Sequence, residues 1–155
     1  MTLEWFSWGS IKLSASPPHS AVYRIRLVSE GDSVTIPRFL ASDPEGILSI
    51  GVSGNMERRR KAFLRGLAHG RGHSEANLLR LLQIHTSLIH LFPDAEIQYS
   101  YAMAANREDA ASAEEAILKG YVVEFGEVPP LNSAIPNRYH WASWEDAARR
   151  SRGAI

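Results

Sequence analysis

Ile47-Leu-Ser-Ile-Gly-Val-Ser-Gly-Asn-Met-Glu-Arg-Arg59 changes from a strand pattern to a helix pattern within a few residues. Its apolar start predicts a strand over Ile47–Gly51, and Asn55 is a good N-cap for a helix that runs to residues 66–70. Upstream, Ala21–Val28 alternates apolar and polar residues, which is the period of a half-buried strand. The two strands predict an antiparallel hairpin with an inserted connection.

Downstream of that helix, the pattern predicts two more helices and one more strand. Ser74 is a candidate cap for a helix from Glu75 to about Leu91, whose apolar residues we expect to form a broad buried face: Leu78, Leu79, Leu82, Ile84, Leu88, Ile89 and Leu91. Glu96–Met103 alternates like a strand, and an alanine-rich helix should run from Arg107 to about Val123. The fold class expected is therefore α/β (α+β), a small three-stranded antiparallel sheet flanked by helices in the order β-β-α-α-β-α.

The composition is that of one folded unit. With 155 residues, of which 45% are hydrophobic and 22% charged, the chain can bury a sizeable core. We expect an N-terminal extension over residues 1–20, the domain over 21–135, and a C-terminal extension over 136–155 that packs on the domain. The chain has no cysteine and no apolar run near the roughly 18 residues of a membrane span, which favours a cytoplasmic protein without a membrane partner.

The charges balance in number but not in position. Lysine plus arginine and aspartate plus glutamate each total 17, which argues against a protein that coats nucleic acid through net charge alone. The segment from Arg58 to Arg80 is basic, with Glu75 as its one acid, whereas the segment from Asp94 to Glu127 is mainly acidic. This arrangement suits a site that holds a polyanion and a divalent cation together, and two solvated helix faces of opposite sign explain it about equally well.

A series of short motifs follows in order between residues 21 and 132. They are Ala21-Val-Tyr23, Ser49-Ile-Gly51, Asn55-Met-Glu-Arg-Arg59, Glu114-Glu-Ala-Ile-Leu-Lys-Gly-Tyr121 and Pro129-Pro-Leu-Asn132. Each motif is weak alone, but in this order, and with these elements around them, they resemble the motifs of the GIY-YIG nuclease superfamily. The chain is similar to a divergent member of that superfamily.

The resemblance implies a metal-dependent endonuclease that hydrolyses phosphodiester bonds of DNA. Glu114 would hold a single Mg²⁺ (or Mn²⁺) ion, because such a hard cation prefers carboxylate and water oxygens. Arg59 would donate to the scissile phosphate, and Asn132 would support the site near the metal or the phosphate. Tyr23 would deprotonate or orient the attacking water, although its ordinary pKa of about 10 is too high for a base unless nearby cations lower it. The substrate-binding residues expected beside them are Ser49, Arg58, Lys61, Arg65 and His73.

The position of the metal-binding glutamate depends on where the motifs are anchored. Counting back from Asn132 with the spacing of compact family members leads to Gly120, which would mean an inactive enzyme. The helix motif itself gives Glu114, with extra residues in the loop at 125–128. We favour Glu114, because loops absorb insertions and the spacing along a helix face cannot. The other options are Glu115 and Glu124.

Two residues depart from the family pattern. Ser49 stands where the second motif has tyrosine, and Phe63 stands where many members have histidine or tyrosine. Both changes remove a titratable or donor group from the corner that activates water, and His69 or His73 could reach into it from the following loop. The alternative hypothesis is a catalytically weak or inactive domain that binds nucleic acid or a protein partner. A third hypothesis is an interaction module that forms a homo-oligomer through its apolar helix.

Overall fold

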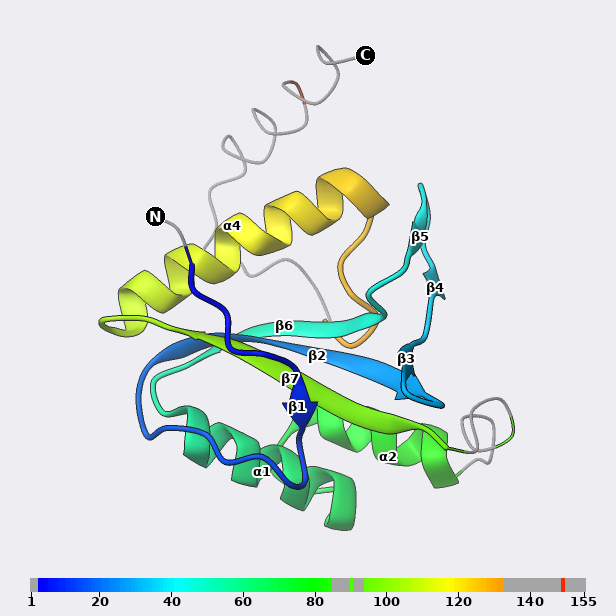
Figure 1. Cartoon of the computed structure of the whole chain (residues 1–155), viewed down its shortest axis with the longest axis horizontal. Helices are drawn as coiled ribbons and strands as arrows, with labels where there is room; N and C mark the ends of the chain where they lie inside the picture. Colours follow the sequence, from blue (N-terminus) through cyan, green and yellow to red (C-terminus); the bar gives the residue numbers. More distant parts are fainter. Residues whose placement is uncertain (1–2, 85–89, 91–93, 133–148, 150–155) are drawn as a thin grey trace.

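The computed structural model describes residues 3–84, 90, 94–132 and 149. It has a mixed α+β fold built on an antiparallel sheet, which confirms the predicted class (Figure 1). Helices α1 (Met56–His69) and α2 (Ser74–Ile84) cover one face of the sheet, and α4 (Arg107–Phe125) covers the other. No helix in this described part of the chain is long and apolar enough to cross a membrane.

The strand β2 (Ala21–Ser29) lies at the centre of the sheet, antiparallel to both β6 (Ile47–Ser53) and β7 (Glu96–Met103). The prediction of three strands was wrong in number, since the sheet has five strands within the described residues. The additional strands are β1 (Gly9–Ser10), which pairs with β7, and β3 (Asp32–Ser33), which pairs with β2. A strand of two residues is too short to produce a periodic pattern, so the sequence does not indicate it.

The residues expected to form an N-terminal extension lie along the outer edge of β7. The backbone N–H of Phe6 donates to the Tyr101 carbonyl at 2.9 Å, and Ile11 is buried in the main core. The segment before β2 therefore completes the sheet on that side. The predicted C-terminal extension lies outside the described residues, apart from Arg149.

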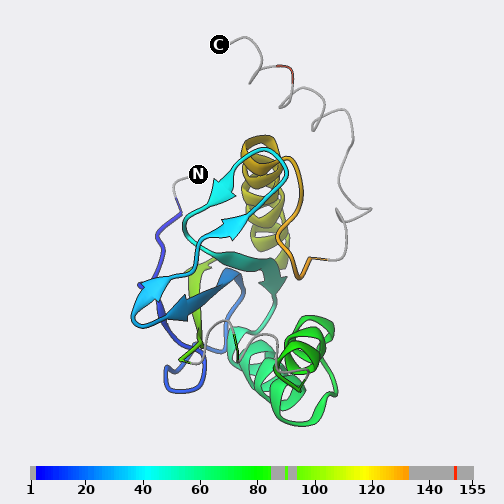
Figure 2. The same cartoon turned by 90° about the vertical axis from the view of Figure 1, so that its right-hand side faces the viewer.

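The connection between β2 and β6 contains a small hairpin of β4 (Ile36–Pro37) and β5 (Ser42–Asp43), which lies beside α4 (Figure 2). The N–H of Leu40 donates to the Phe125 carbonyl at 3.0 Å. The buried carboxylate of Asp43 accepts hydrogen bonds from the Ile47 N–H at 2.9 Å and from the Tyr121 hydroxyl at 3.0 Å. These bonds attach the start of β6 to the C-terminal half of α4.

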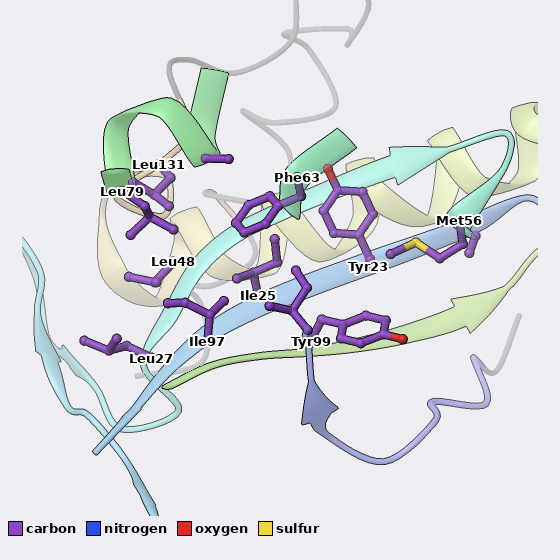
Figure 3. Close-up of a cluster of buried hydrophobic side chains, with 13 residues drawn as sticks. Tyr23, Ile25, Leu27, Leu48, Met56, Phe63, Leu79, Ile97, Tyr99 and Leu131 are labelled. Carbon is purple, nitrogen blue, oxygen red and sulfur yellow. The ribbon is translucent and has the colours of Figure 1, made fainter. Parts of the chain in front are cut away.

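The main core lies between the sheet and helices α1 and α2. Alternate residues of β2 point to this side, as the two-residue period of a strand requires, and pack with Phe63 of α1 and Leu79 of α2 (Figure 3). The intervening residue Val22 packs under α4. The buried face of α2 is narrower than predicted, because Leu78 and Leu82 are 43% and 39% exposed. The predicted positions Leu88, Ile89 and Leu91 lie outside the described residues.

Candidate active site

Tyr23 of the first motif lies directly over Gly51 of the second. The two residues are partners in the antiparallel register of β2 and β6, so their side-chain positions face the same side of the sheet. A Cβ atom on Gly51 would stand 2.5 Å from Cζ and Oη of Tyr23. Only glycine at this position leaves room for the phenol ring.

The Tyr23 side chain is buried, and its surroundings favour the neutral phenol. Burial raises the pKa of Tyr23 well above its ordinary value, and the Glu75 carboxylate adds to the increase. The Arg59 guanidinium opposes this change, and Glu114 reinforces it. The effect of Arg59, the cation that would have to lower the pKa of Tyr23, is therefore smaller than the effects that raise it. Tyr23 is suited to orient a water molecule by hydrogen bonding rather than to deprotonate it.

Arg59 is held at the junction of three elements. It lies in the first turn of α1, which begins where predicted because the Asn55 side chain accepts a hydrogen bond from the Arg58 N–H at 2.8 Å. Its Nη2 donates to the Val52 carbonyl at 3.2 Å, and its Nη1 lies 3.2 Å from Nε2 of His73. The guanidinium carbon is 5.9 Å from the centre of the Tyr23 ring, which is at the limit of a cation–π contact.

His73 is the loop histidine that reaches into the corner with Phe63. Its ring packs edge-on against Phe63, with 5.1 Å between the ring centres. Because an arginine can only donate, Nε2 of His73 must be the acceptor from Arg59, and Nδ1 then carries the ring proton. Burial, followed by the Arg59 charge, lowers the pKa of His73 to about 4. The imidazole is therefore neutral near pH 7 and positions the guanidinium.

Glu75 belongs to the same cluster, although none of the sequence motifs includes it. Its Oε2 lies 3.7 Å from Nδ1 of His73, and its side chain is only 16% exposed. Burial raises the pKa of Glu75 to about 7; the Ser49 hydroxyl and Arg59 lower it, and Glu114 raises it further. A signal was present in the sequence, since Glu75 is the one acid in the basic segment from Arg58 to Arg80.

Of the three glutamates considered for the metal, Glu114 is the one that interacts with this cluster. It is a buried residue of α4, and its charge raises the pKa of both Tyr23 and Glu75. Glu115 instead forms a salt bridge with Lys119 at 2.9 Å. Glu124 lines a different pocket of about 410 Å³, together with Gly120. The electrostatics therefore agree better with Glu114 than with the other two, and its role as the motif glutamate stays a prediction.

A basic pocket of about 620 Å³ opens beside Arg59. Residues 52–55 line it, and its other charged lining residues are Arg58, Arg65 and Arg107. None of these three forms a salt bridge with a described acidic residue. Arg107, the first residue of α4, was not predicted, because only the tertiary fold brings it to α1. Lys61 is engaged elsewhere, in a salt bridge with Glu57 at 2.6 Å.

Two of the predicted substrate-binding residues are buried rather than exposed to a ligand. Ser49 has no exposed surface, and His73 is 6% exposed. The Ser49 hydroxyl faces the interior beside Glu75, so both residues act within the cluster. Arg58 and Arg65 are exposed in the basic pocket.

Asn132 holds the free edge of β6. Its Oδ1 accepts from the Ile50 N–H at 3.0 Å, and its Nδ2 donates to the Ile50 carbonyl at 2.8 Å. The neighbouring Leu131 N–H donates to the Leu48 carbonyl at 2.8 Å. Asn132 thus substitutes for a further strand beside the second motif, and its contact with a metal or phosphate stays a prediction.

Asn132→Ala should lower the free energy of unfolding by about 1–3 kcal/mol, because the Ile50 peptide loses both hydrogen-bond partners at a partly buried edge. Urea denaturation measures this change. Asn132→Asp is the matched control. One of its carboxylate oxygens can still accept from the Ile50 N–H, but the other would face the Ile50 carbonyl oxygen. This variant should therefore also be less stable than wild type. Wild-type stability of the alanine variant would contradict this role.

The oxygen atoms of the cluster are compatible with a hard divalent cation. Within residues 3–84, 90, 94–132 and 149, no group of three or more His, Asp or Glu residues is arranged to share a metal ion. The charge of Glu114 raises the pKa of Glu75, so the two carboxylates interact electrostatically. Mg²⁺ commonly binds to one or two carboxylates and keeps several water ligands, so the residues present fit such an ion.

The cluster combines a guanidinium, a neutral phenol, a neutral imidazole and two carboxylates beside an arginine-lined pocket. Comparison of the chain with protein-family models, with curated proteins and with solved structures finds no match. The chemistry of the site itself is what indicates a function. A guanidinium with carboxylates and a basic pocket is suited to bind a phosphate ester and to stabilise added charge on it.

Proposed function

We propose that the chain is a divergent GIY-YIG-type endonuclease domain that hydrolyses phosphodiester bonds of DNA with Mg²⁺ or Mn²⁺. The observation that carries this proposal is the cluster of Tyr23, Arg59 and Glu114: the Arg59 guanidinium carbon lies 5.9 Å from the centre of the Tyr23 ring beside the basic pocket, and the Glu114 charge acts on the Tyr23 hydroxyl. They come from β2, α1 and α4, and are separated by long stretches of chain. The long described elements follow one another as β2-β6-α1-α2-β7-α4, the order predicted from the sequence.

The arginines of the basic pocket would bind the DNA backbone. Arg58, Arg65 and Arg107 line the pocket beside Arg59 and have no described acidic partners that would compete with phosphate. The Arg59 guanidinium, already oriented by Val52 and His73, donates to the phosphate that is attacked. Its positive charge stabilises the negative charge that develops on the phosphate oxygens.

The remaining residues act on the attacking water. The Tyr23 phenol donates or accepts a hydrogen bond and thereby orients the water molecule. Glu114 would hold the divalent ion, with Glu75 as the neighbouring carboxylate. When bound, such an ion supplies Lewis-acid stabilisation of the phosphate and lowers the pKa of a coordinated water.

A catalytically inactive domain that binds nucleic acid is the second candidate. It is favoured by Ser49 and Phe63, which replace groups that the family uses, and by the raised pKa of Tyr23. Its basic pocket would still bind phosphates. Binding that weakens with salt and is never followed by cleavage would favour this candidate over the endonuclease.

The endonuclease proposal predicts that supercoiled or branched DNA is nicked in Mg²⁺ or Mn²⁺, and that Glu114→Ala and Arg59→Ala each reduce the rate about 10²- to 10³-fold. Glu115→Ala is the matched control, because this neighbouring carboxylate pairs with Lys119 outside the cluster. Its rate should stay within about twofold of wild type. Gel electrophoresis of the nicked product gives the rates. Equal nicking by all the variants, or nicking by none including wild type, would overturn the proposal.

A further inference from the structure

A second basic pocket, of about 560 Å³, adjoins the pocket beside Arg59. It is formed by the C-terminal half of α1, the loop that follows and α2, which lie on one face of the sheet (Figure 2). Its lining residues are Arg65, Ala68, His69, Arg71, Gly72 and Arg80. Arg65 lines both pockets, so the two hollows meet at this side chain. The proposed endonuclease site uses only the first of them.

One face of α1 connects the two pockets. Arg58, Ala62, Arg65 and His69 follow one another at the three- and four-residue spacing that places side chains on the same side of a helix. The first two line the first pocket, and His69 lines the second. At about 1.5 Å per residue, this stripe is about 16 Å long. One strand of B-DNA carries a phosphate about every 3.4 Å along the duplex axis, so the stripe is long enough for roughly five phosphates.

The two pockets together form a basic track that is lined by no acidic residue within the described part of the chain. Its lining includes six arginines: Arg58, Arg59, Arg65 and Arg107 in the first pocket, and Arg71 and Arg80 in the second. Arg58, Arg65 and Arg71 are exposed and form no salt bridge with a described acidic residue. Because the whole chain has no net charge, this concentration of positive charge is local. Such a surface attracts a polyanion.

Arg80 is held in the second pocket by the end of α1. Its Nη1 donates to the Leu67 carbonyl at 3.0 Å and to the Ala68 carbonyl at 2.7 Å. These carbonyls belong to the last turn of the helix, whose partial negative charge would otherwise repel an anion. A guanidinium has five N–H donors, and the two bonds use only those on Nη1. Arg80 therefore neutralises the helix end and lines the pocket with a guanidinium of fixed orientation.

The lining of the basic track favours the backbone of duplex DNA over other polyanions. Proteins that bind single strands usually stack aromatic side chains on the bases, and no described Phe, Tyr or Trp lines either pocket. A membrane surface is bound by apolar side chains that enter the lipid, and the described lining has no apolar side chain larger than Val52. Arginines spaced along a helix match the repeated phosphates of a DNA strand.

We propose that the basic track binds one strand of duplex DNA, with phosphates that flank the scissile one in the second pocket. The inference rests on the proposed endonuclease function, which places the scissile phosphate at Arg59. From Arg59 the strand follows α1 past Arg65 and reaches Arg71 and Arg80. The substrate is therefore a duplex that extends for several base pairs to one side of the cut. Contacts with phosphates alone make this binding independent of the DNA sequence.

The test measures binding of a fluorescein-labelled duplex by anisotropy at several salt concentrations, without divalent metal, so that it does not depend on cleavage. For wild type, contacts from six arginines predict a slope of about −5 for the logarithm of the binding constant against the logarithm of the salt concentration. Arg71→Ala, in the exposed loop between α1 and α2, should make this slope less negative by about 1 and weaken binding about 3- to 10-fold. Lys12→Ala is the matched control, because it removes an exposed positive charge that lines neither pocket. Its slope should equal that of wild type, and its affinity should stay within about twofold.

The outcomes separate the second pocket from the nuclease function. If Arg71→Ala binds the duplex with the affinity and slope of wild type, the DNA does not reach the second pocket and the inference is overturned, while nicking by wild type in Mg²⁺ would still support the endonuclease. If Arg71→Ala weakens binding as expected but wild type nicks no DNA, the endonuclease proposal fails and the basic track stands as a DNA-binding surface. Tighter binding of a single strand of the same length than of the duplex would overturn the inference. So would a wild type that binds vesicles with about 20% phosphatidylserine and no duplex.

Discussion

Gly51→Ala should lower the free energy of unfolding by about 1–3 kcal/mol and displace the Tyr23 ring from the site. The added Cβ would meet Cζ and Oη of this ring at 2.5 Å, and the ring is 2% exposed, with little room to move. Urea denaturation measures the loss, and the nicking rate reports the displaced phenol. We expect both to fall together.

The matched control is Gly120→Ala, the same change at an exposed position in α4. No atom lies within 4 Å of a Cβ at Gly120, and alanine favours a helix interior by about 1 kcal/mol over glycine. This variant should therefore be more stable than wild type. A double variant, Gly51→Ala with Tyr23→Ala, should show a favourable coupling, because removal of the ring relieves the clash. Wild-type stability of Gly51→Ala alone would contradict the packing of Tyr23 on Gly51.

Glu75→Gln should be more stable than wild type by as much as about 3 kcal/mol above pH 8. In the folded protein the Glu75 pKa is about 7, against an ordinary value of 4.5. The folded state therefore binds the proton more tightly, and wild-type stability falls as the pH rises from about 4.5 through 7. The neutral amide does not undergo this loss. The difference between the two proteins should vanish as the pH falls toward 4.5.

Urea denaturation of both proteins at about pH 5, 6.5 and 8 measures how their difference in stability grows with pH. The low pKa of His73 also makes stability depend on pH: protonation destabilises the fold as the pH falls from about 6.5 toward 4. That effect is common to wild type and variant and cancels in their difference. Glu96→Gln, which removes an exposed carboxylate at the start of β7, should show no such pH-dependent difference in stability from wild type. Parallel stability curves for wild type and Glu75→Gln would rule out an unfavourable buried charge at Glu75.

A carboxylate that destabilises the fold near neutral pH is the kind of residue that is kept for function. Glutamine has almost the same shape as glutamate and would remove the cost of burying the charge. A loss of nicking activity in Glu75→Gln, measured beside its gain in stability, would show that the carboxylate is retained at a cost to the fold. Neither result alone would show the trade-off, and both together would.

The regular elements around the site could be predicted because their signals are local. The strand Glu96–Met103 has the predicted bounds, and Asn55 caps α1 as expected. Alternation and capping depend on residues a few positions apart, so they are readable without the fold. The β1 and β3 strands had no such signal, because their pairing is decided by β7 and β2.

The sequence by itself determined the α+β class and the motif residues Tyr23, Arg59 and Glu114. Only the tertiary structure decided that His73 and Glu75 complete their cluster, that Arg107 joins the basic pocket, and that Asn132 holds the edge of β6. The physical reason is that burial and the distances between charges arise from contacts between segments far apart in the chain. The raised pKa of Glu75 is caused first by desolvation beneath packed elements, which no local pattern records.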